Sequence, residues 1–158
     1  MSEGEPKLIV IGCGKQGAGD HGAALEVIIR LRAMPDLGCE LRTCEEGCPP
    51  GFLAEIPPDT LVIFIDALQT STEAGTIHCL RLPSTLAHPR HLESGSYNLR
   101  QEIDLARERN GRVPRMCLLG IEVTNNMSGS ELSEKVRKAV DEIVLNFPRY
   151  RKLAQGLA

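Results

Sequence analysis

Three side chains in this sequence are suited to binding a metal ion together: His21, Asp66 and His91. Asp66 directly follows five apolar residues, 61–65, so it is expected just beyond the end of a buried strand. Two imidazoles and a carboxylate are a ligand set that suits nickel or zinc. Simpler interpretations stand beside this one, because strand-end aspartates also cap turns and an isolated histidine can simply be solvated.

The glycine-rich segment 12–22 (GCGKQGAGDHG) contains the pattern G-x-G-x-x-G. Between a strand and a helix, this pattern binds dinucleotides when its third glycine already belongs to the helix. Here helical periodicity begins only after Gly22, and Glu45 is a weak match for the acidic residue that such a site needs. We therefore expect no bound nucleotide, and a small Rossmann-like nucleotide-binding protein stays as an alternative. The segment can also be a plain turn in which Asp20 caps the following helix.

The cysteines and serines form no recognisable site. Cys39, Cys44 and Cys48 are separated by four and then three residues, and the chain has no Cys-x-x-Cys pair. Structural zinc sites usually show such pairs, so the sequence predicts buried or idle thiols. The chain also lacks the G-x-S-x-G turn of serine hydrolases, which argues against that class.

Hydrophobic patterning predicts the elements that must position these residues. The predicted strands are 7–12, 39–43, 61–65, 76–82 and 116–121, and the predicted helices are 24–31, 52–56, 98–109 and 130–147. A frayed basic tail is expected from Arg149 onward. Strands that alternate with helices predict an α/β fold: a three-layer sandwich with a mainly parallel, five-stranded twisted sheet and helices on both faces.

In a sheet of this kind, ligands bind beyond the carboxyl ends of the strands. The loops expected at that edge follow the first, third, fourth and fifth strands, and they are 13–22, 66–75, 83–96 and 122–129. The first three of these loops carry the three candidate ligands. The topology therefore predicts that they meet at one edge of the sheet.

Composition bounds the class of protein. With 158 residues, a net charge of −3, 42% hydrophobic and 25% charged residues, the chain is expected to form a single domain over 1–158. Its charges are interspersed and only 3% of its residues are aromatic, which argues against nucleic acid as a partner. The longest apolar run, 61–65, is far shorter than the ~20 residues of a membrane span. We therefore expect a cytoplasmic protein with reduced thiols and no membrane insertion.

Four short motifs follow one another along the chain: Gly-Asp-His-Gly at 19–22, Ile-Asp-Ala at 65–67, Ala-Gly-Thr-Ile at 74–77 and Leu-Gly-Ile-Glu at 119–122. Their order resembles that of the hydrogenase maturation endopeptidases, and the resemblance covers about 7–147. It implies an α/β endopeptidase that removes a short C-terminal peptide from the large-subunit precursor of a nickel-iron (NiFe) hydrogenase, once nickel has been inserted. The nickel is then carried by the substrate rather than bound permanently by the protease.

The resemblance also implies that three protease residues contact this nickel. These are a carboxylate in the glycine loop, an aspartate after the central strand and a histidine before the third helix. Asp66 matches the aspartate and is the expected catalytic residue, whereas His21 stands at the carboxylate position, with Asp20 as a substitute carboxylate. Gly95 stands at the histidine position, so His91, four residues upstream, would complete a rewired site. The alternative is a non-catalytic pseudo-protease that binds the precursor or nickel.

Overall fold

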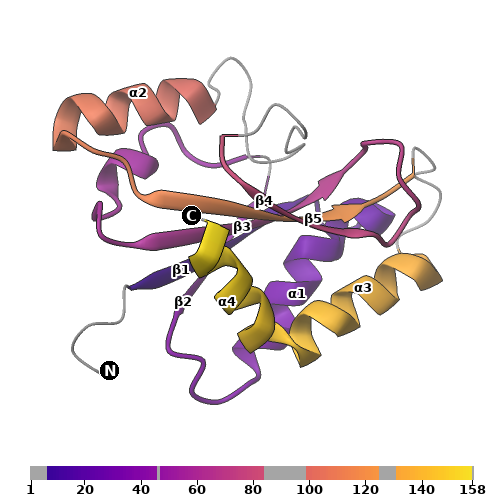
Figure 1. Cartoon of the computed structure of the whole chain (residues 1–158). Helices are drawn as coiled ribbons and strands as arrows, with labels where there is room; N and C mark the ends of the chain where they lie inside the picture. Colours follow the sequence, from indigo (N-terminus) through magenta and orange to yellow (C-terminus); the bar gives the residue numbers. More distant parts are fainter. Residues whose placement is uncertain (1–6, 46, 84–98, 125–130, 158) are drawn as a thin grey trace.

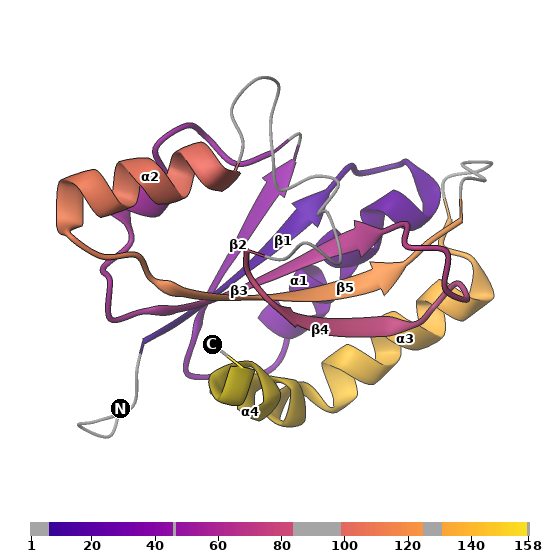
Figure 2. The same cartoon turned by 45° about the horizontal axis from the view of Figure 1, so that its top comes forward.

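The computed structural model describes residues 7–45, 47–83, 99–124 and 131–157, and these form a five-stranded sheet between two layers of helix (Figure 1). The strands are β1 (Leu8–Gly14), β2 (Glu40–Glu45), β3 (Leu61–Leu68), β4 (Ile77–Arg81) and β5 (Arg115–Glu122). Their order across the sheet is β2-β1-β3-β5-β4 (Figure 2), with β4 antiparallel to β5 and the other neighbours parallel. The mainly parallel five-stranded sheet is as predicted.

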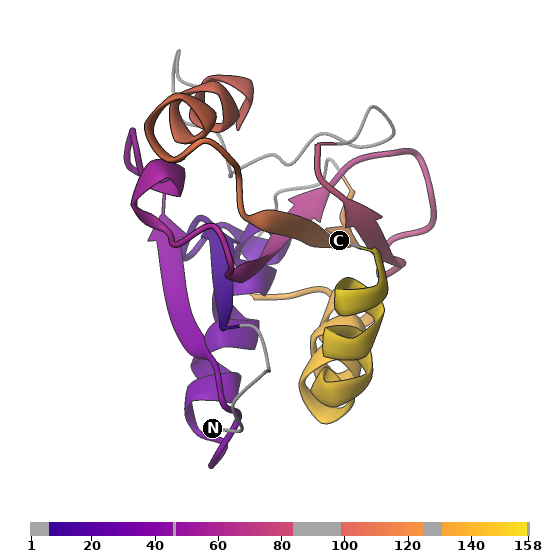
Figure 3. The same ribbon diagram turned by 60° about the vertical axis from the view of Figure 1, so that its left-hand side comes forward.

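Helices cover both faces of the sheet (Figure 3). One face packs against α1 (Ala23–Arg32), α3 (Glu134–Leu145) and α4 (Phe147–Leu157), and the other against α2 (Leu99–Asn110) and the short 3-10 helix η2 (Leu53–Glu55). A separate hydrophobic core lies under each layer, which confirms the predicted three-layer sandwich. In the described part of the chain, no helix has the length and apolar character that crossing a membrane requires.

The central strand β3 has eight residues, all of them buried, because β1 and β5 pair with its two edges and helices cover its two faces. Its side chains alternate between the two cores. Ile63 and Ile65 belong to the core under α1, α3 and α4, whereas Val62 and Phe64 belong to the core under α2. The strand therefore fixes which helical layer each of its side chains meets.

The C-terminal region differs from the predicted helix at 130–147 and frayed tail. Two helices, α3 and α4, meet at Asn146, and α4 continues almost to the end of the chain. Three side chains of α4 are buried at helical spacing: Phe147, Tyr150 and Ala154. Arg151 also donates a hydrogen bond of 2.9 Å to the carbonyl of Leu37. The predicted fraying is wrong because this apolar stripe, hidden among basic residues, packs against the sheet.

The orientation of β4 fixes the position of the segment that precedes it. β4 begins beside Ile121, near the end of β5, and ends beside Cys117. The segment 69–76 joins β3 to β4 without a helix to return the chain, so β4 must start at the edge where β3 ends. As a result, 69–76 lies at the carboxyl edge of the parallel strands, and β4 ends at Arg81 near their amino end. Of the predicted loop 83–96, residues 84–96 lie outside the described residues.

Candidate functional site

Asp66 lies within β3 and is fully buried, with 0% of its surface exposed. The sequence predicted a position just beyond the strand, but β3 continues because Ala67 and Leu68 pair with the last two residues of β5. Since side chains alternate along a strand, Asp66 projects to the same face as Phe64, the face covered by α2. Its Oδ1 accepts a hydrogen bond of 2.7 Å from the N–H of Ala67. The carboxylate is therefore held inside the molecule, near the carboxyl end of the sheet.

His21 lies on a 3-10 helix, η1 (Gly19–Gly22), which precedes α1 and contacts β3. Only 4% of His21 is exposed. Its carbonyl accepts a hydrogen bond of 3.0 Å from the N–H of Lys15, and its N–H donates one of 3.2 Å to Ala18. A Cβ at Gly14 would lie 2.5 Å from the His21 carbonyl oxygen, so the glycine lets β1 and η1 approach this closely. The fold therefore brings His21 to the same end of the sheet as Asp66.

The third predicted ligand, His91, lies outside the described residues, as does Gly95. The helix that follows them in sequence, α2, covers the sheet face toward which Asp66 projects. Among the residues that the structure describes, no group of three His, Cys, Asp or Glu side chains is arranged to hold a metal ion. A metal contacted by His21 and Asp66 therefore needs further ligands from elsewhere in the chain or from a substrate.

Asp20, the predicted substitute carboxylate, ties the glycine loop to the start of α3. Its Oδ1 accepts a hydrogen bond of 2.7 Å from the N–H of Ser133, and its Oδ2 accepts one of 2.8 Å from the Ser133 hydroxyl. Ser133 is the N-cap of α3, and its side chain forms no capping bond of its own. Asp20 therefore caps α3, which is distant in sequence, where its charge also meets the positive end of the helix dipole. The prediction that it caps the helix directly after it is wrong.

The Asp20→Ala variant is expected to unfold more easily by about 1–3 kcal/mol, because it leaves the Ser133 N–H at the helix start without its partner. Urea unfolding followed by circular dichroism measures this loss. Asp104→Ala, at an exposed position of α2, is the matched control and is expected to change stability by less than ~0.5 kcal/mol. A loss no larger than the control's would show that the contact between Asp20 and Ser133 contributes nothing.

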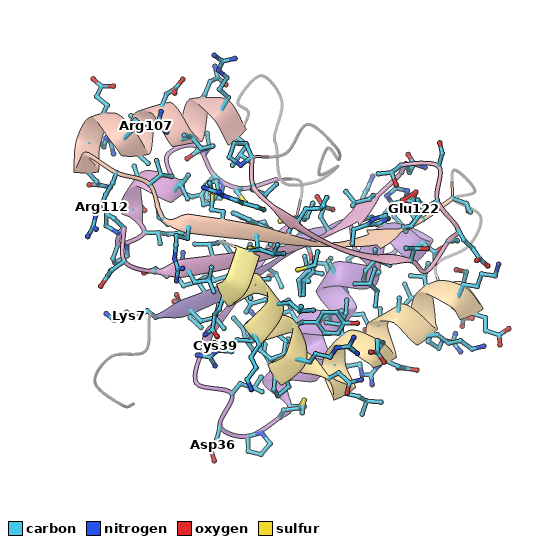
Figure 4. The ribbon with its side chains drawn as sticks, viewed as in Figure 1. Lys7, Asp36, Cys39, Arg107, Arg112 and Glu122 are labelled. Atoms are coloured by element: carbon cyan, nitrogen blue, oxygen red, sulfur yellow. The ribbon has the colours of Figure 1, made fainter. Side chains whose placement is uncertain are left out.

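Glu122, the last residue of β5, binds the segment 69–76 through its carboxylate. It lies at the opposite end of the sheet from Lys7 and Arg112 (Figure 4). Its carboxylate accepts hydrogen bonds from the Thr70 N–H at 2.6 Å, the Thr70 hydroxyl at 2.9 Å and the Thr72 N–H at 2.9 Å. The residue is 1% exposed. Sequence reasoning gave Glu122 no role, although it follows an apolar strand just as Asp66 does.

The pKa of Glu122 predicts how this segment responds to acid. Burial by itself raises this pKa, but the hydrogen bonds from Thr70 and Thr72 outweigh burial and hold it below the ordinary value of 4.5. The stabilisation is therefore present above that value and is lost as the pH falls through the lowered pKa. We expect Glu122→Gln to cost about 1–3 kcal/mol at neutral pH and much less in strong acid. Unfolding of both proteins across the acidic range tests this, and a gap that does not narrow would contradict it.

The glycines of the first loop serve close packing. A Cβ at Gly12 would lie 2.5 Å from the Cγ1 of Ile28 and 2.8 Å from the Ala24 carbonyl oxygen, so α1 packs directly on β1.

Beside this loop, a groove runs between α1 and the edge strand β2. Its lining includes Gln16, Gly17, Leu25, Thr43 and Glu45. The carboxyl edge of the sheet thus combines a buried carboxylate, a buried imidazole and a groove.

Several solved structures share this fold. The NiFe hydrogenase maturation protease HycI from Thermococcus kodakarensis is 21% identical, with a TM-score of 0.70 over 95% of each chain. HybD from the same organism is 21% identical, with a TM-score of 0.65 over 94% of this chain and 99% of that one. The hydrogenase maturating endopeptidase HybD from E. coli is 16% identical, with a TM-score of 0.69 over 92% and 93%. No protein-family model matches the sequence, and the curated proteins include no significant match. The chain therefore has the fold of the hydrogenase maturation proteases, as the sequence resemblance implied.

Proposed function

We propose that this protein is an endopeptidase that removes the C-terminal extension from a nickel-loaded large-subunit precursor of a NiFe hydrogenase. The observation that carries the proposal is the placement of Asp66. In a fold shared with hydrogenase maturation proteases, this carboxylate is fully buried near the carboxyl end of the central strand, and the element that bears His21 contacts the same strand. A buried carboxylate at such a position is typical of a functional site.

In this proposal the nickel belongs to the substrate and is contacted by Asp66, His21 and His91, with Asp20 as a substitute carboxylate. Asp66 is the catalytic residue. The carboxylate oxygens of Asp20 accept hydrogen bonds from Ser133, which favours His21 as the contact supplied by the glycine loop. A contact that needs the metal lets the protease select precursors that already carry nickel and reject empty ones.

The groove beside the glycine loop supports an extended peptide as substrate. It is lined by polar and apolar side chains, including Gln16, Leu25 and Thr43, and it reaches the outer strand β2. An exposed edge strand has unpaired backbone groups, to which an extended peptide can add by hydrogen bonding. We infer that the C-terminal extension of the precursor lies along this groove during cleavage.

The proposal is tested by incubating the purified protein with a nickel-loaded precursor and following the mass of the precursor. The expected result is loss of the C-terminal extension, with no loss from the same precursor prepared without nickel. If the precursor keeps its extension while an established maturation protease removes it, the proposed activity is wrong. The proposed setting is the cytoplasm, where lasting structural disulfides are rare.

A second candidate is a non-catalytic protein that binds the precursor. It is favoured by the imidazole of His21 at the position where the resemblance implies a carboxylate, and by the engagement of Asp20 with Ser133. This candidate predicts that the protein and the precursor co-elute in size-exclusion chromatography while the mass of the precursor stays unchanged. The mass measurement therefore separates the two candidates.

A further inference from the structure

Three cysteines meet at the carboxyl ends of β1 and β2, and we call Cys13, Cys44 and Cys48 the thiol cluster. Cys13 and Cys44 are direct neighbours in the register of the two parallel strands. Cys48 follows β2 and belongs to the core under α2, together with Cys13, while Cys44 packs against the same core. Cys39, Cys79 and Cys117 lie instead on the opposite face of the sheet. The sequence showed no tight cysteine pair because strand pairing brings Cys13 beside Cys44, and Cys48 packs into the same core from outside the sheet.

The three thiols differ in their access to solvent. Cys13 is 0% exposed and Cys48 is 5% exposed, whereas Cys44 is half-buried. Cys44 is therefore the thiol that a small reagent reaches first. Its neighbours Cys13 and Cys48 are the thiols that can then react with the modified Cys44.

Hydrogen bonding within the thiol cluster concentrates negative charge on Cys44. Hydrogen bonds from Cys13 and Cys48 lower the pKa of Cys44 to about 4, although burial opposes this. The pKa of Cys13 is raised by its hydrogen bonds to Cys44 and Cys48, by burial and by the charge of Asp66. A hydrogen bond with Cys13 lowers the pKa of Cys48, but its bond to Cys44 and burial raise it more. Because the thiolate is the reactive form, Cys44 is the nucleophile of the cluster.

We propose that Cys44 and Cys48 form a reversible disulfide, so that the thiol cluster is a redox modification site. Among the described residues, no three ligating side chains are arranged for a metal ion, which favours disulfide chemistry at these thiols. Cys48 is the partner rather than Cys13, because Cys13 lies on β1, which is hydrogen-bonded on both sides to β2 and β3. Cys48 lies outside the sheet, directly after Gly47 with φ of +94°. A shift of Cys48 toward Cys44 therefore breaks no strand pairing.

The oxidant is a low-molecular-weight disulfide such as oxidised glutathione. The Cys44 thiolate attacks one sulfur of this disulfide, which breaks its S–S bond, leaves a mixed disulfide on Cys44 and releases one small thiol. The Cys48 sulfur then attacks the Cys44 sulfur and releases the second small thiol. The first released thiolate takes a proton from water, the second takes the proton that Cys48 gives up, and the two electrons lost by the protein reduce the small disulfide.

The test uses the full chain and does not depend on the proposed peptidase activity. The protein is incubated with oxidised glutathione, denatured, alkylated and examined by mass spectrometry with peptide mapping. The expected product binds two fewer alkyl groups than the six of the reduced chain and carries a Cys44–Cys48 disulfide that dithiothreitol reverses. A disulfide between Cys44 and Cys13, or no disulfide at all, would overturn the proposal without using any variant.

Variants sharpen this assignment. Cys48→Ser is expected to stop at the mixed disulfide, so that glutathione accumulates on Cys44, whereas Cys44→Ser is expected to form no disulfide. Cys79→Ser, on the opposite face of the sheet, is the matched control and is expected to form the disulfide to the same extent as the unmodified chain. An intramolecular disulfide retained in Cys44→Ser would assign the reaction to other thiols and overturn the proposal.

Discussion

The Asp66→Asn variant is expected to cleave a nickel-loaded precursor roughly 100-fold more slowly than the unmodified protein, or slower still. Mutating a residue that only orients a metal ligand typically lowers metal affinity or activity by roughly 10- to 100-fold, and the loss of a direct ligand is expected to cost at least as much. Asparagine has nearly the same size and keeps an oxygen that can accept the hydrogen bond from the Ala67 N–H. What it removes is the negative charge, which the proposed contact with nickel needs. The rate at which the precursor loses the mass of its extension measures this effect.

Two controls separate the charge of Asp66 from its place in the core. Asp104→Asn makes the same chemical change at an exposed position of α2 and is expected to cleave at the unmodified rate. Thermal unfolding of Asp66→Asn shows whether the protein is folded at the assay temperature. A folded Asp66→Asn protein that cleaves at the unmodified rate would remove Asp66 from the catalytic role.

Local patterns were enough to predict much of the fold. The apolar run 61–65 predicted β3 because a strand covered on both faces needs apolar residues at every position. The end of α2 was also predictable from the sequence, because a glycine, Gly111, follows it. Gly111 adopts a φ of +76°, and its N–H donates a hydrogen bond of 2.9 Å to the Arg107 carbonyl. In both cases the signal lies within a few residues of the feature that it predicts.

The features that sequence reasoning missed depend on contacts between distant segments. The bond between Asp20 and Ser133 joins residues 113 positions apart, so no local pattern announces it. The direction of β4 follows from the absence of a helix in the connection 69–76, whereas the apolar pattern of a strand is the same in either direction. The stripe of α4 was concealed because basic residues stand between its apolar positions.

The candidate site was predictable in part for the same reason. Asp66 and Glu122 both follow apolar strands, so both were visible in the sequence as carboxylates near strand ends. Their different surroundings were not visible, because β3 continues past Asp66 and encloses it, whereas β5 ends at Glu122 and leaves it to bind the segment 69–76. The sequence thus identifies both carboxylates. The pairing of the strands then places Asp66 in a buried site and leaves Glu122 to bind the segment 69–76.

Substitutions at His21 test whether its imidazole replaces the carboxylate that the family resemblance implies. His21→Ala removes the ring and is expected to slow cleavage of the nickel-loaded precursor by roughly 10- to 100-fold. His21→Glu is expected to retain most of the rate, because a carboxylate oxygen also binds a divalent metal and the nickel of the precursor compensates its charge. Cleavage time courses with the two variants side by side measure this difference.

A merely structural role for His21 predicts a different result. His21 is 4% exposed, so if its ring only fills space in η1, the buried charge of His21→Glu disturbs packing and lowers cleavage at least as much as His21→Ala does. Affinity for the precursor provides a second readout. Contact with nickel predicts that His21→Ala weakens binding of the nickel-loaded precursor and leaves binding of the nickel-free precursor unchanged, whereas a packing defect weakens both equally. Equal losses for the two precursors would therefore exclude His21 from the metal contact.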